Sequence, residues 1–255
     1  MRISIDEASH VLVLTGAGIS AESGVPTFRD AGGLWEGHAV TDVATPEGFE
    51  RDPLLVWRFY AERRAAMTGI APNAGHRALV ELERQLGERF LLATQNIDGL
   101  HPAAGSERVL EIHGNLMRSR CTGCARPAFA DTTAYRANVV PVCGQCRSAG
   151  AESALRPDVV WFGEALAPGT LERVEQFVTA AGTRLVFLAI GTSGQVYPAA
   201  ALVDVTRRVG GTSWLVNLER PANASSFDHV VLGPAGRELP ALLGQADRRD
   251  DAADR

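Results

Sequence analysis

Short runs of apolar residues recur along the chain and predict the strands of a buried parallel sheet. Six such runs occur, at residues 11–14, 90–93, 109–112, 185–190, 214–218 and 229–232. A strand covered on both faces is apolar throughout rather than at alternate positions. Apolar residues at helical spacing lie between these runs, at 74–85, 171–181 and 199–208. This alternation predicts an α/β fold with helices on both faces of the sheet.

Two segments interrupt the alternation and are predicted to be insertions. Residues 37–72 hold one amphipathic helix, at about 53–68, with a loop on either side. Residues 119–155 hold all four cysteines and little apolar periodicity. The sheet domain is then assigned to the three segments 1–36, 73–118 and 156–243. The polar, charged end at 244–255 is expected to be disordered.

Composition narrows the class of protein. The chain has 255 residues, 45% hydrophobic content and a net charge of −5, which does not favour nucleic acid or anionic membranes. No apolar run approaches the ~20 residues that span a bilayer. The first residues lack the pattern of a secretory signal, so a cytoplasmic protein is expected. All 25 basic residues are arginine, so the chain has no lysine side chain that could be acylated.

A glycine-rich turn follows the first apolar run. Gly16, Gly18 and Ala21 have the spacing of a dinucleotide-binding turn, in which the glycines permit a tight turn and close approach of a phosphate. The N-terminus of the helix predicted to follow would face the phosphates. The stretch 23–26, Ser-Gly-Val-Pro, ends that helix early. The polar loop from Thr27 to about Trp35 is then interpreted as a flexible cover over the ligand.

The cysteines form two CxxC pairs, separated by 18 residues, with the spacing of a four-thiolate zinc site. The predicted ligands are Cys121, Cys124, Cys143 and Cys146. Four thiolates leave no open position for water, so the zinc ion is expected to be structural. A zinc ribbon that grips nucleic acid is the alternative, but few aromatic residues accompany the arginines of this segment.

Polar residues follow several of the predicted strands, where ligands bind in open α/β sheets. Thr94 to Asp98 follows the second strand, and His113 follows the third, where it could act as a general base. Gly191–Ser193 and Asn217–Glu219 end two later strands. Each group could equally be an ordinary turn or a hydrogen-bonded core residue. The other five histidines (His10, His38, His76, His101 and His229) have no comparable context.

Taken together, the motifs resemble the sirtuin family of NAD-dependent protein deacylases over about residues 8–243. The segments that carry the resemblance are GAGISAESGVPTFRD at 16–30, QNIDGLH at 95–101, HG at 113–114, the two CxxC pairs, VVWFGE at 159–164, GTS at 191–193 and GPAG at 233–236. They occur in the order found in the family. The resemblance implies a Rossmann-like domain and a smaller zinc-and-helix domain, with the substrate peptide in the cleft between them.

The resemblance also implies roles for individual residues. It implies NAD contacts from Gly16, Ala17, Gly18, Ser20, Ala21, Glu22, Thr27, Phe28, Arg29, Trp35, Gln95, Asn96, Ile97, Asp98, Gly191, Thr192, Ser193, Asn217, Leu218, Glu219 and Ala235. Asn96 and Asp98 would hold the nicotinamide amide, and His113 would be the catalytic base. The segment 159–164 would be the strand segment to which the acylated peptide pairs, with substrate contacts from Val160, Trp161, Phe162, Gly163 and Glu164. The products would be free lysine, nicotinamide and O-acyl-ADP-ribose.

The predicted helix at 53–68 indicates which type of acyl group the protein would prefer. Tyr60 and Arg63 lie three residues apart and share a face, and the surrounding motif resembles that of class III sirtuins, which prefer acidic acyl groups. A guanidinium and a phenol can hold a carboxylate, and Ala44 would leave room for it. Both residues could otherwise belong to a solvated helix face.

Three other functions remain open. An NAD-dependent dehydrogenase is disfavoured because the stretch 23–26 breaks the first helix, which an ordinary dehydrogenase would continue. A non-catalytic NAD-binding or zinc-ribbon protein would release no nicotinamide. A mono-ADP-ribosyltransferase would label protein from NAD. The chain is expected to act on acylated protein lysines as a monomer.

Overall fold

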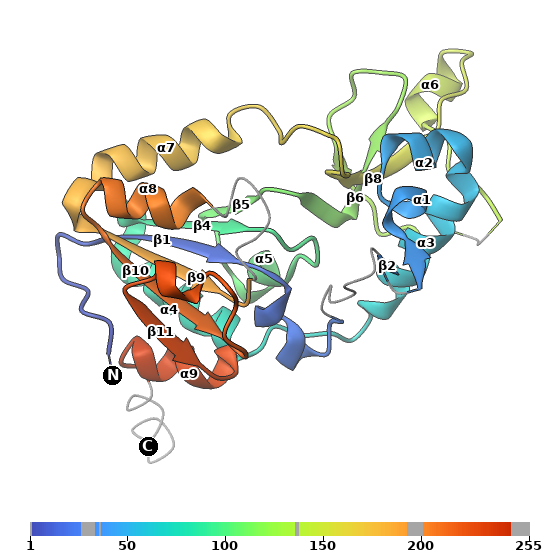
Figure 1. The fold of residues 1–255 in the computed structure, drawn as a ribbon. Helices are drawn as coiled ribbons and strands as arrows, with labels where there is room; N and C mark the ends of the chain where they lie inside the picture. The colour runs from blue at the N-terminus through green and yellow to red at the C-terminus, as the bar shows by residue number, and fades with distance from the viewer. Residues whose placement is uncertain (1, 27–33, 36, 136–137, 193–200, 246–255) are drawn as a thin grey trace, which may run out of the picture.

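The computed structural model describes residues 2–26, 34–35, 37–135, 138–192 and 201–245 (Figure 1). The predicted cofactor residues Thr27, Phe28, Arg29 and Ser193 lie outside these ranges. None of the described helices is long and apolar enough to cross a membrane.

The six apolar runs form one parallel sheet with the strand order β11-β10-β9-β1-β4-β5. Its strands are β1 (His10–Thr15), β4 (Phe90–Thr94), β5 (Val109–Glu111), β9 (Leu185–Ile190), β10 (Thr212–Asn217) and β11 (His229–Leu232). The central strands β1, β4 and β9 are buried along almost their whole length, which explains why they are apolar at every position. The prediction of an α/β protein built on a parallel sheet is confirmed.

Helices cover both faces of this sheet and define two hydrophobic cores. The first core receives leucines from α4 (Ala74–Leu86) and α9 (Ala235–Leu242). The second receives valines from α7 (Thr170–Ala181) and α8 (Leu202–Arg208). The short helix α5 (Leu100–Ala104) packs against α4. The chain therefore winds in both directions from β1 as a doubly wound sheet, and the prediction of a Rossmann-like domain with helices on both faces is confirmed.

A smaller group of elements lies at one side of the sheet (Figure 1). Three strands form an antiparallel sheet in the order β7-β6-β8, namely β6 (Gly114–Cys121), β7 (Phe129–Ala130) and β8 (Leu155–Val159). With them lie α1 (Val40–Val43), α2 (Pro46–Arg51), α3 (Pro53–Ala66), α6 (Gly144–Ser148) and the two-stranded pair β2 (Leu34–Trp35) and β3 (His38–Ala39). The small sheet starts before residue 119 and ends after residue 155. The assignment of domain boundaries stays a prediction.

The prediction of a single helix in 37–72 is wrong, because α1 and α2 precede α3. Both are too short, at four and six residues, to show a helical period. Their signals are local instead. Thr45 and Asp52 cap the N-termini of α2 and α3, and each is followed by a proline in the first helical turn.

A third hydrophobic core joins α3 to the small sheet. Trp57 and Tyr60 of α3 are fully buried in it, together with two of the cysteines. Arg64 of α3 is also buried and donates to the carbonyl oxygens of Leu116 and Arg118 in β6. A buried guanidinium with these partners fixes the helix against the strand.

Candidate active site

Two strand-end turns meet backbone to backbone at the carboxyl edge of the parallel sheet. The amide of Gly16 donates to the carbonyl of Ile190 over 3.0 Å, and the amide of Gly18 donates to the carbonyl of Gly191 over 2.8 Å. A Cβ atom added at Gly18 would lie 2.6 Å from the Gly191 Cα atom. Such a distance cannot be accommodated without moving backbone, so glycine is required for the turn that follows β1.

The predicted helix after β1 is not present. The chain forms two 3-10 turns instead, at Ala17–Ile19 and Ala21–Ser23. Gly24 then adopts φ = 88°, a left-handed conformation that ends the helical geometry. Short 3-10 turns leave more backbone amides unpaired than a continued helix does, which suits a segment that faces phosphates.

A cavity of about 220 Å³ opens between these turns and the ends of β10 and β11. Its lining residues are Gly18, Ala21, Glu22, Gly191, Val216, Asn217, Leu218, Gly233, Pro234 and Ala235. The Glu22 carboxylate accepts from the amide of Gly236 over 2.6 Å, at the N-terminus of α9. The predicted cofactor residues from four separate motifs therefore share one cavity, whose glycine-lined wall suits a dinucleotide.

Asn96 and Asp98 lie beside the turn that follows β1. The Asn96 side-chain amide donates to the Gly16 carbonyl over 3.1 Å and to Ser20 Oγ over 3.2 Å. Ser20 Oγ donates in turn to the Asp98 carboxylate over 2.7 Å. Burial raises the pKa of Asp98, while the Leu100 amide and Ser20 oppose that shift. These bonds give the predicted nicotinamide-binding pair one orientation relative to the glycine-rich turn.

His113 follows β5 and is hydrogen-bonded in a way that defines its tautomer. Its Nδ1 atom lies 3.0 Å from the Gln95 carbonyl oxygen. A carbonyl only accepts, so Nδ1 carries the proton and Nε2 keeps a lone pair. Burial lowers the pKa of His113, and the bond to Gln95 offsets part of that shift. The ring is thus neutral at physiological pH and able to accept a proton at Nε2.

The end of β9 is joined to the same group. Thr192 Oγ1 donates to the Gln95 side-chain oxygen over 2.8 Å. The Asn217 side chain, at the end of β10, lies 3.5 Å from the Thr192 carbonyl oxygen. The strand ends predicted to face one crevice are therefore connected by hydrogen bonds across β4, β9 and β10.

Tyr60 and Arg63 occupy one face of α3, as predicted, but they are not a solvated pair. Tyr60 is fully buried, and its hydroxyl oxygen accepts from Trp161 Nε1 over 2.9 Å. Burial raises the pKa of Tyr60, so the phenol keeps its proton. The Arg63 guanidinium carbon lies 3.2 Å from the Phe59 ring centroid and 5.6 Å from that of Trp35. The two polar groups are held by an aromatic wall.

Of the strand segment predicted at 159–164, only Val159 belongs to a strand, and residues 160–164 do not. β8 ends at Val159, and Gly163 has φ = 87°. The segment is nevertheless anchored: the Val160 amide donates to the His113 carbonyl over 2.9 Å, and the Phe162 amide donates to the Ala44 carbonyl over 2.9 Å. Phe162 is 54% exposed. The amides of Trp161 and Glu164 are bonded as well, so among the described residues the Gly163 amide and several carbonyl groups of the segment are left for another chain.

The Glu164 side chain is held by this protein's own residues. Arg156 donates to both of its carboxylate oxygens, over 2.6 and 2.9 Å, and Arg120 donates over 3.1 Å. The Trp161 amide adds a fourth bond, over 2.8 Å. These bonds place Glu164 as the anchor of the turn at 161–164.

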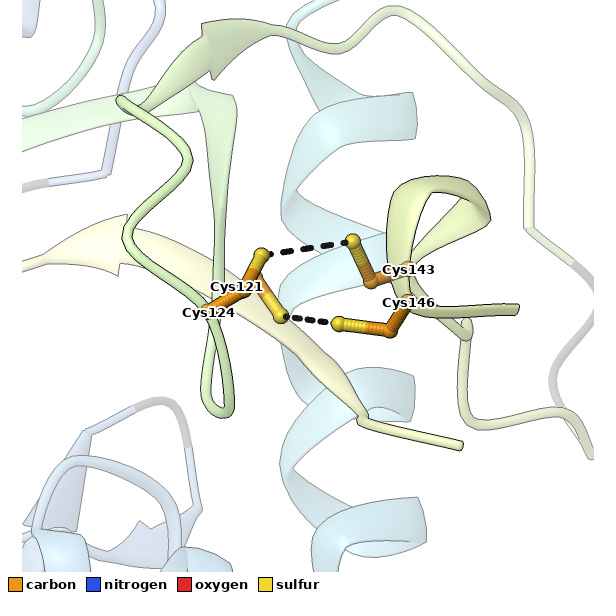
Figure 2. A group of neighbouring side chains, drawn as sticks. All are labelled: Cys121, Cys124, Cys143 and Cys146. Carbon is orange, nitrogen blue, oxygen red and sulfur yellow. Dashed lines mark hydrogen bonds between the residues drawn. The ribbon is translucent and has the colours of Figure 1, made fainter. Parts of the chain in front are cut away.

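The four cysteines come together as predicted (Figure 2). Their sulfur atoms all lie within 4.8 Å of one another, with 3.6 Å between Cys121 and Cys146 and 4.0 Å between Cys124 and Cys143. Tetrahedral zinc with Zn–S bonds of about 2.3 Å requires sulfur atoms about 3.8 Å apart. The donor set and its dimensions fit a structural zinc ion that joins the end of β6 to α6.

Two histidines that received no role from the sequence, His76 and His101, lie close to residues that hold the glycine-rich turn. His101 is 1% exposed, and its Nε2 atom lies 2.9 Å from Thr15 Oγ1 at the end of β1. His76 lies beside it, with ring centroids 4.8 Å apart. Asn73 caps α4 and also donates to the Ile19 carbonyl. Two features of the sequence could have identified these residues: the capping asparagine before α4, and the position of His101 within the motif at 95–101.

Comparison with known proteins agrees with this geometry. The model of the Sir2 family matches residues 16–198. The chain is 48% identical over 244 residues to an NAD-dependent protein deacylase of Rhodopirellula baltica, covering 92% of this chain and 97% of that protein. It is 45% identical to one of Salmonella typhimurium, covering 93% and 84%.

Solved structures are similar as well. A Sir2 homologue in complex with NAD superposes with a TM-score of 0.83 at 37% identity, covering 95% of this chain and 92% of the other. A Sir2 protein bound to acetylated peptide gives a TM-score of 0.76 at 28% identity, covering 93% of each chain.

Proposed function

The chain belongs to the Sir2 family, and on this basis we propose that it removes acyl groups from protein lysines in an NAD-dependent reaction. NAD and one structural zinc ion are its cofactors. The observation that carries the proposal is the hydrogen bond from His113 Nδ1 to the Gln95 carbonyl, within a group that also holds Asn96 and Asp98. A neutral imidazole with an available Nε2 lone pair then belongs to the same crevice as the predicted cofactor residues.

When bound, NAD supplies the ADP-ribosyl group that accepts the acyl group, with loss of nicotinamide. We assign His113 Nε2 the task of taking a proton from the ribose hydroxyls. Asn96 and Asp98 are assigned to orient the nicotinamide amide, supported by their bonds to Gly16, Ser20 and Leu100. The cavity residues Gly18, Glu22, Asn217 and Ala235 are assigned to the diphosphate and adenosine end.

We assign the acylated peptide to the segment 160–164. The amides of Val160, Trp161, Phe162 and Glu164 already donate within the protein, so the peptide would pair with the Gly163 amide and with carbonyl groups of the segment. The bonds to His113 and Ala44 hold this segment between the base and α1. A lysine side chain entering beside His113 then reaches toward the ribose. The match to a Sir2 protein crystallised with acetylated peptide supports this assignment.

The acyl pocket is proposed to favour acidic groups. Arg63 offers a planar guanidinium that can hold a carboxylate through two parallel bonds. Tyr60 accepts from Trp161 and retains its own proton, so it can donate the third bond. We assign the fully buried phenol to the inner end of this pocket, which the acyl group would have to reach. Ala44 is also buried and small, which leaves depth for a succinyl chain.

The decisive experiment supplies NAD with acetyl-, malonyl-, succinyl- and glutaryl-lysine peptides and follows nicotinamide release and acyl-ADP-ribose by mass spectrometry. His113→Ala should lower turnover by about 10²–10⁴-fold, the usual contribution of a general base. His10→Ala, at the N-terminal end of β1 and therefore opposite the glycine-rich turn, is the control. Near-normal turnover in His113→Ala would overturn the assignment of the base.

The same reaction separates the other functions. A mono-ADP-ribosyltransferase would transfer label from NAD to protein, a dehydrogenase would produce NADH, and a non-catalytic protein would release no nicotinamide. Because the chain contains no lysine, every acyl-lysine detected belongs to the added substrate. We retain the cytoplasmic location, the monomeric state and the lack of nucleic-acid binding as predictions.

A further inference from the structure

Two buried histidines lie on the far side of the glycine-rich turn from solvent. His76 belongs to α4 and is 0% exposed, and His101 belongs to α5 and is 1% exposed. Their ring centroids are 4.8 Å apart with an interplanar angle of 57°. Neither residue has a role in the reaction described above, and two buried imidazoles in contact require an account of their hydrogen bonds.

The partners of His76 define its tautomer. Its Nδ1 atom accepts from the backbone amide of Asn73, at 3.3 Å, as part of the capping box that begins α4. Nδ1 therefore carries no proton in the neutral ring, and the proton is on Nε2. This Nε2–H group is buried and has no hydrogen-bond partner among the residues that the structure describes.

The partners of His101 define its tautomer as well, and they leave a hydrogen-bond acceptor unpaired. Thr15 Oγ1 donates its single proton to Thr94 Oγ1 over 2.8 Å. Thr15 can therefore only accept from His101 Nε2, 2.9 Å away, so the His101 proton is on Nε2. Its Nδ1 atom keeps a lone pair and is likewise buried without a partner among the described residues.

The two unpaired atoms are complementary. His76 presents a donor and His101 presents an acceptor, on rings that are in contact. Burial lowers the pKa of His76 to about 4 and that of His101 to about 3, so both rings are neutral at physiological pH and keep these tautomers. A buried donor or acceptor without a partner costs free energy, so a hydrogen-bonded link between these two atoms would stabilise the fold.

Both ends of this arrangement hold the turn that follows β1. At one end, the Asn73 side chain donates to the Ile19 carbonyl over 2.7 Å and to Ser23 Oγ over 3.1 Å. At the other end, Thr94 Oγ1 accepts from the backbone amide of Asn96 over 3.1 Å. The Asn96 side chain then holds the Gly16 carbonyl and Ser20. The two histidines stand between these anchors.

We infer that His76 and His101 are positioning residues: His76 Nε2–H donates to His101 Nδ1 through one enclosed water and completes a buried hydrogen-bonded chain from Asn73 to Asn96 that orients residues 16–24 for NAD. The inference rests on the proposed function for its effect on turnover. The chain itself is a property of the resting protein and can be tested without turnover.

The kinetic test compares His101→Leu with His101→Gln. Leucine removes the donor to Thr15, whereas the side-chain amide of glutamine can place an N–H group near the position of Nε2. His101→Leu should raise KM for NAD about tenfold, equivalent to about 1.4 kcal/mol or one net hydrogen bond, with KM for the acyl peptide nearly unchanged. His101→Gln should recover most of the loss.

A second variant covers the case in which His101→Leu does not fold. Thr15→Val keeps the shape of the side chain and removes the hydroxyl that links His101 to Thr94, so it should raise KM for NAD in the same way. Unchanged KM for NAD in the folded variants, or an equal rise in KM for the peptide, would overturn the inference.

The structural test is nitrogen-15 NMR of the histidine rings in the full chain without ligand. It should find both rings neutral with the proton on Nε2, and a proton on His101 Nδ1 would overturn the chain. Absence of deacylation by the unmodified protein would instead reject the proposed function. In that case NAD affinity, measured by calorimetry in His101→Leu, still tests the positioning role.

Discussion

Acid should destabilise this protein through His76 and His101, and the size of the effect follows from their burial. Both pKa values are lower in the folded chain, at about 4 and about 3, than the ordinary value of 6.5 that the unfolded chain restores. As the pH falls below 6.5, these two histidines become protonated in the unfolded chain but stay neutral in the folded chain. The free energy of unfolding therefore falls with decreasing pH, and the contribution is complete only above pH 6.5.

Linkage converts these pKa values into free energy. Between about pH 7 and pH 5, a histidine that stays neutral in the folded state contributes a loss of about 2 kcal/mol, so the pair contributes about 4 kcal/mol. That is a large share of a total stability of about 5–15 kcal/mol. Most carboxylates stay ionised over this range, so the histidines dominate the slope.

Urea unfolding at several pH values, with zinc present throughout, measures the effect. His101→Gln removes one titrating group, so its pH-dependent loss should be smaller than that of the unmodified chain by about 2 kcal/mol. Thr15→Val lowers stability at neutral pH but keeps both imidazoles, so it should retain the full slope. An identical slope in His101→Gln and in the unmodified chain would refute the reasoning.

Three further predictions concern the cavity, the acyl pocket and the metal. Gly18→Ala, whose Cβ would lie 2.6 Å from the Gly191 Cα, should raise KM for NAD at least about tenfold, whereas Gly144→Ala, where a Cβ meets nothing within 4 Å, should not. Arg63→Met should lower kcat/KM for succinyl peptides about 10–100-fold and for acetyl peptides much less. Arg58→Met, at an exposed position of the same helix, is the control. Equal losses on both peptides would contradict the assignment of Arg63. Cys143→Ser should abolish binding of one zinc ion and lower kcat more than NAD affinity, measured by metal analysis and calorimetry.

The sequence was most informative where local pattern and tertiary environment agree. The run at 185–190 matches β9 residue for residue, and the run at 11–14 lies within β1. Strands that are buried on both faces are apolar at every position, so the parallel sheet could be predicted from the sequence. The CxxC spacing likewise contains most of the zinc geometry.

The sequence was less informative where the structure depends on distant partners. The turn at 160–164 is shaped by bonds to Ala44 and by arginines at 120 and 156, none of which a local pattern reveals. The contact between His76 and His101 joins two helices 25 positions apart. A single histidine in a helix forms no repeating pattern in the sequence, so its contact partner could be found only from the fold.

The small sheet connects the four cysteines to the residues that we propose for proton transfer and peptide binding. β6 begins at Gly114, next to His113, and ends at Cys121; β8 runs beside it, and Gly114 pairs with Val159. An eight-residue strand is about 24 Å long, so the metal cannot act on the reaction through its charge. It acts by holding one end of the β6–β8 pair, whose other end carries His113 and the Val160 anchor. The cavity that we propose for NAD is lined by the turn after β1 and by the ends of β9, β10 and β11. Loss of zinc should therefore disturb proton transfer and peptide placement while the cofactor cavity persists.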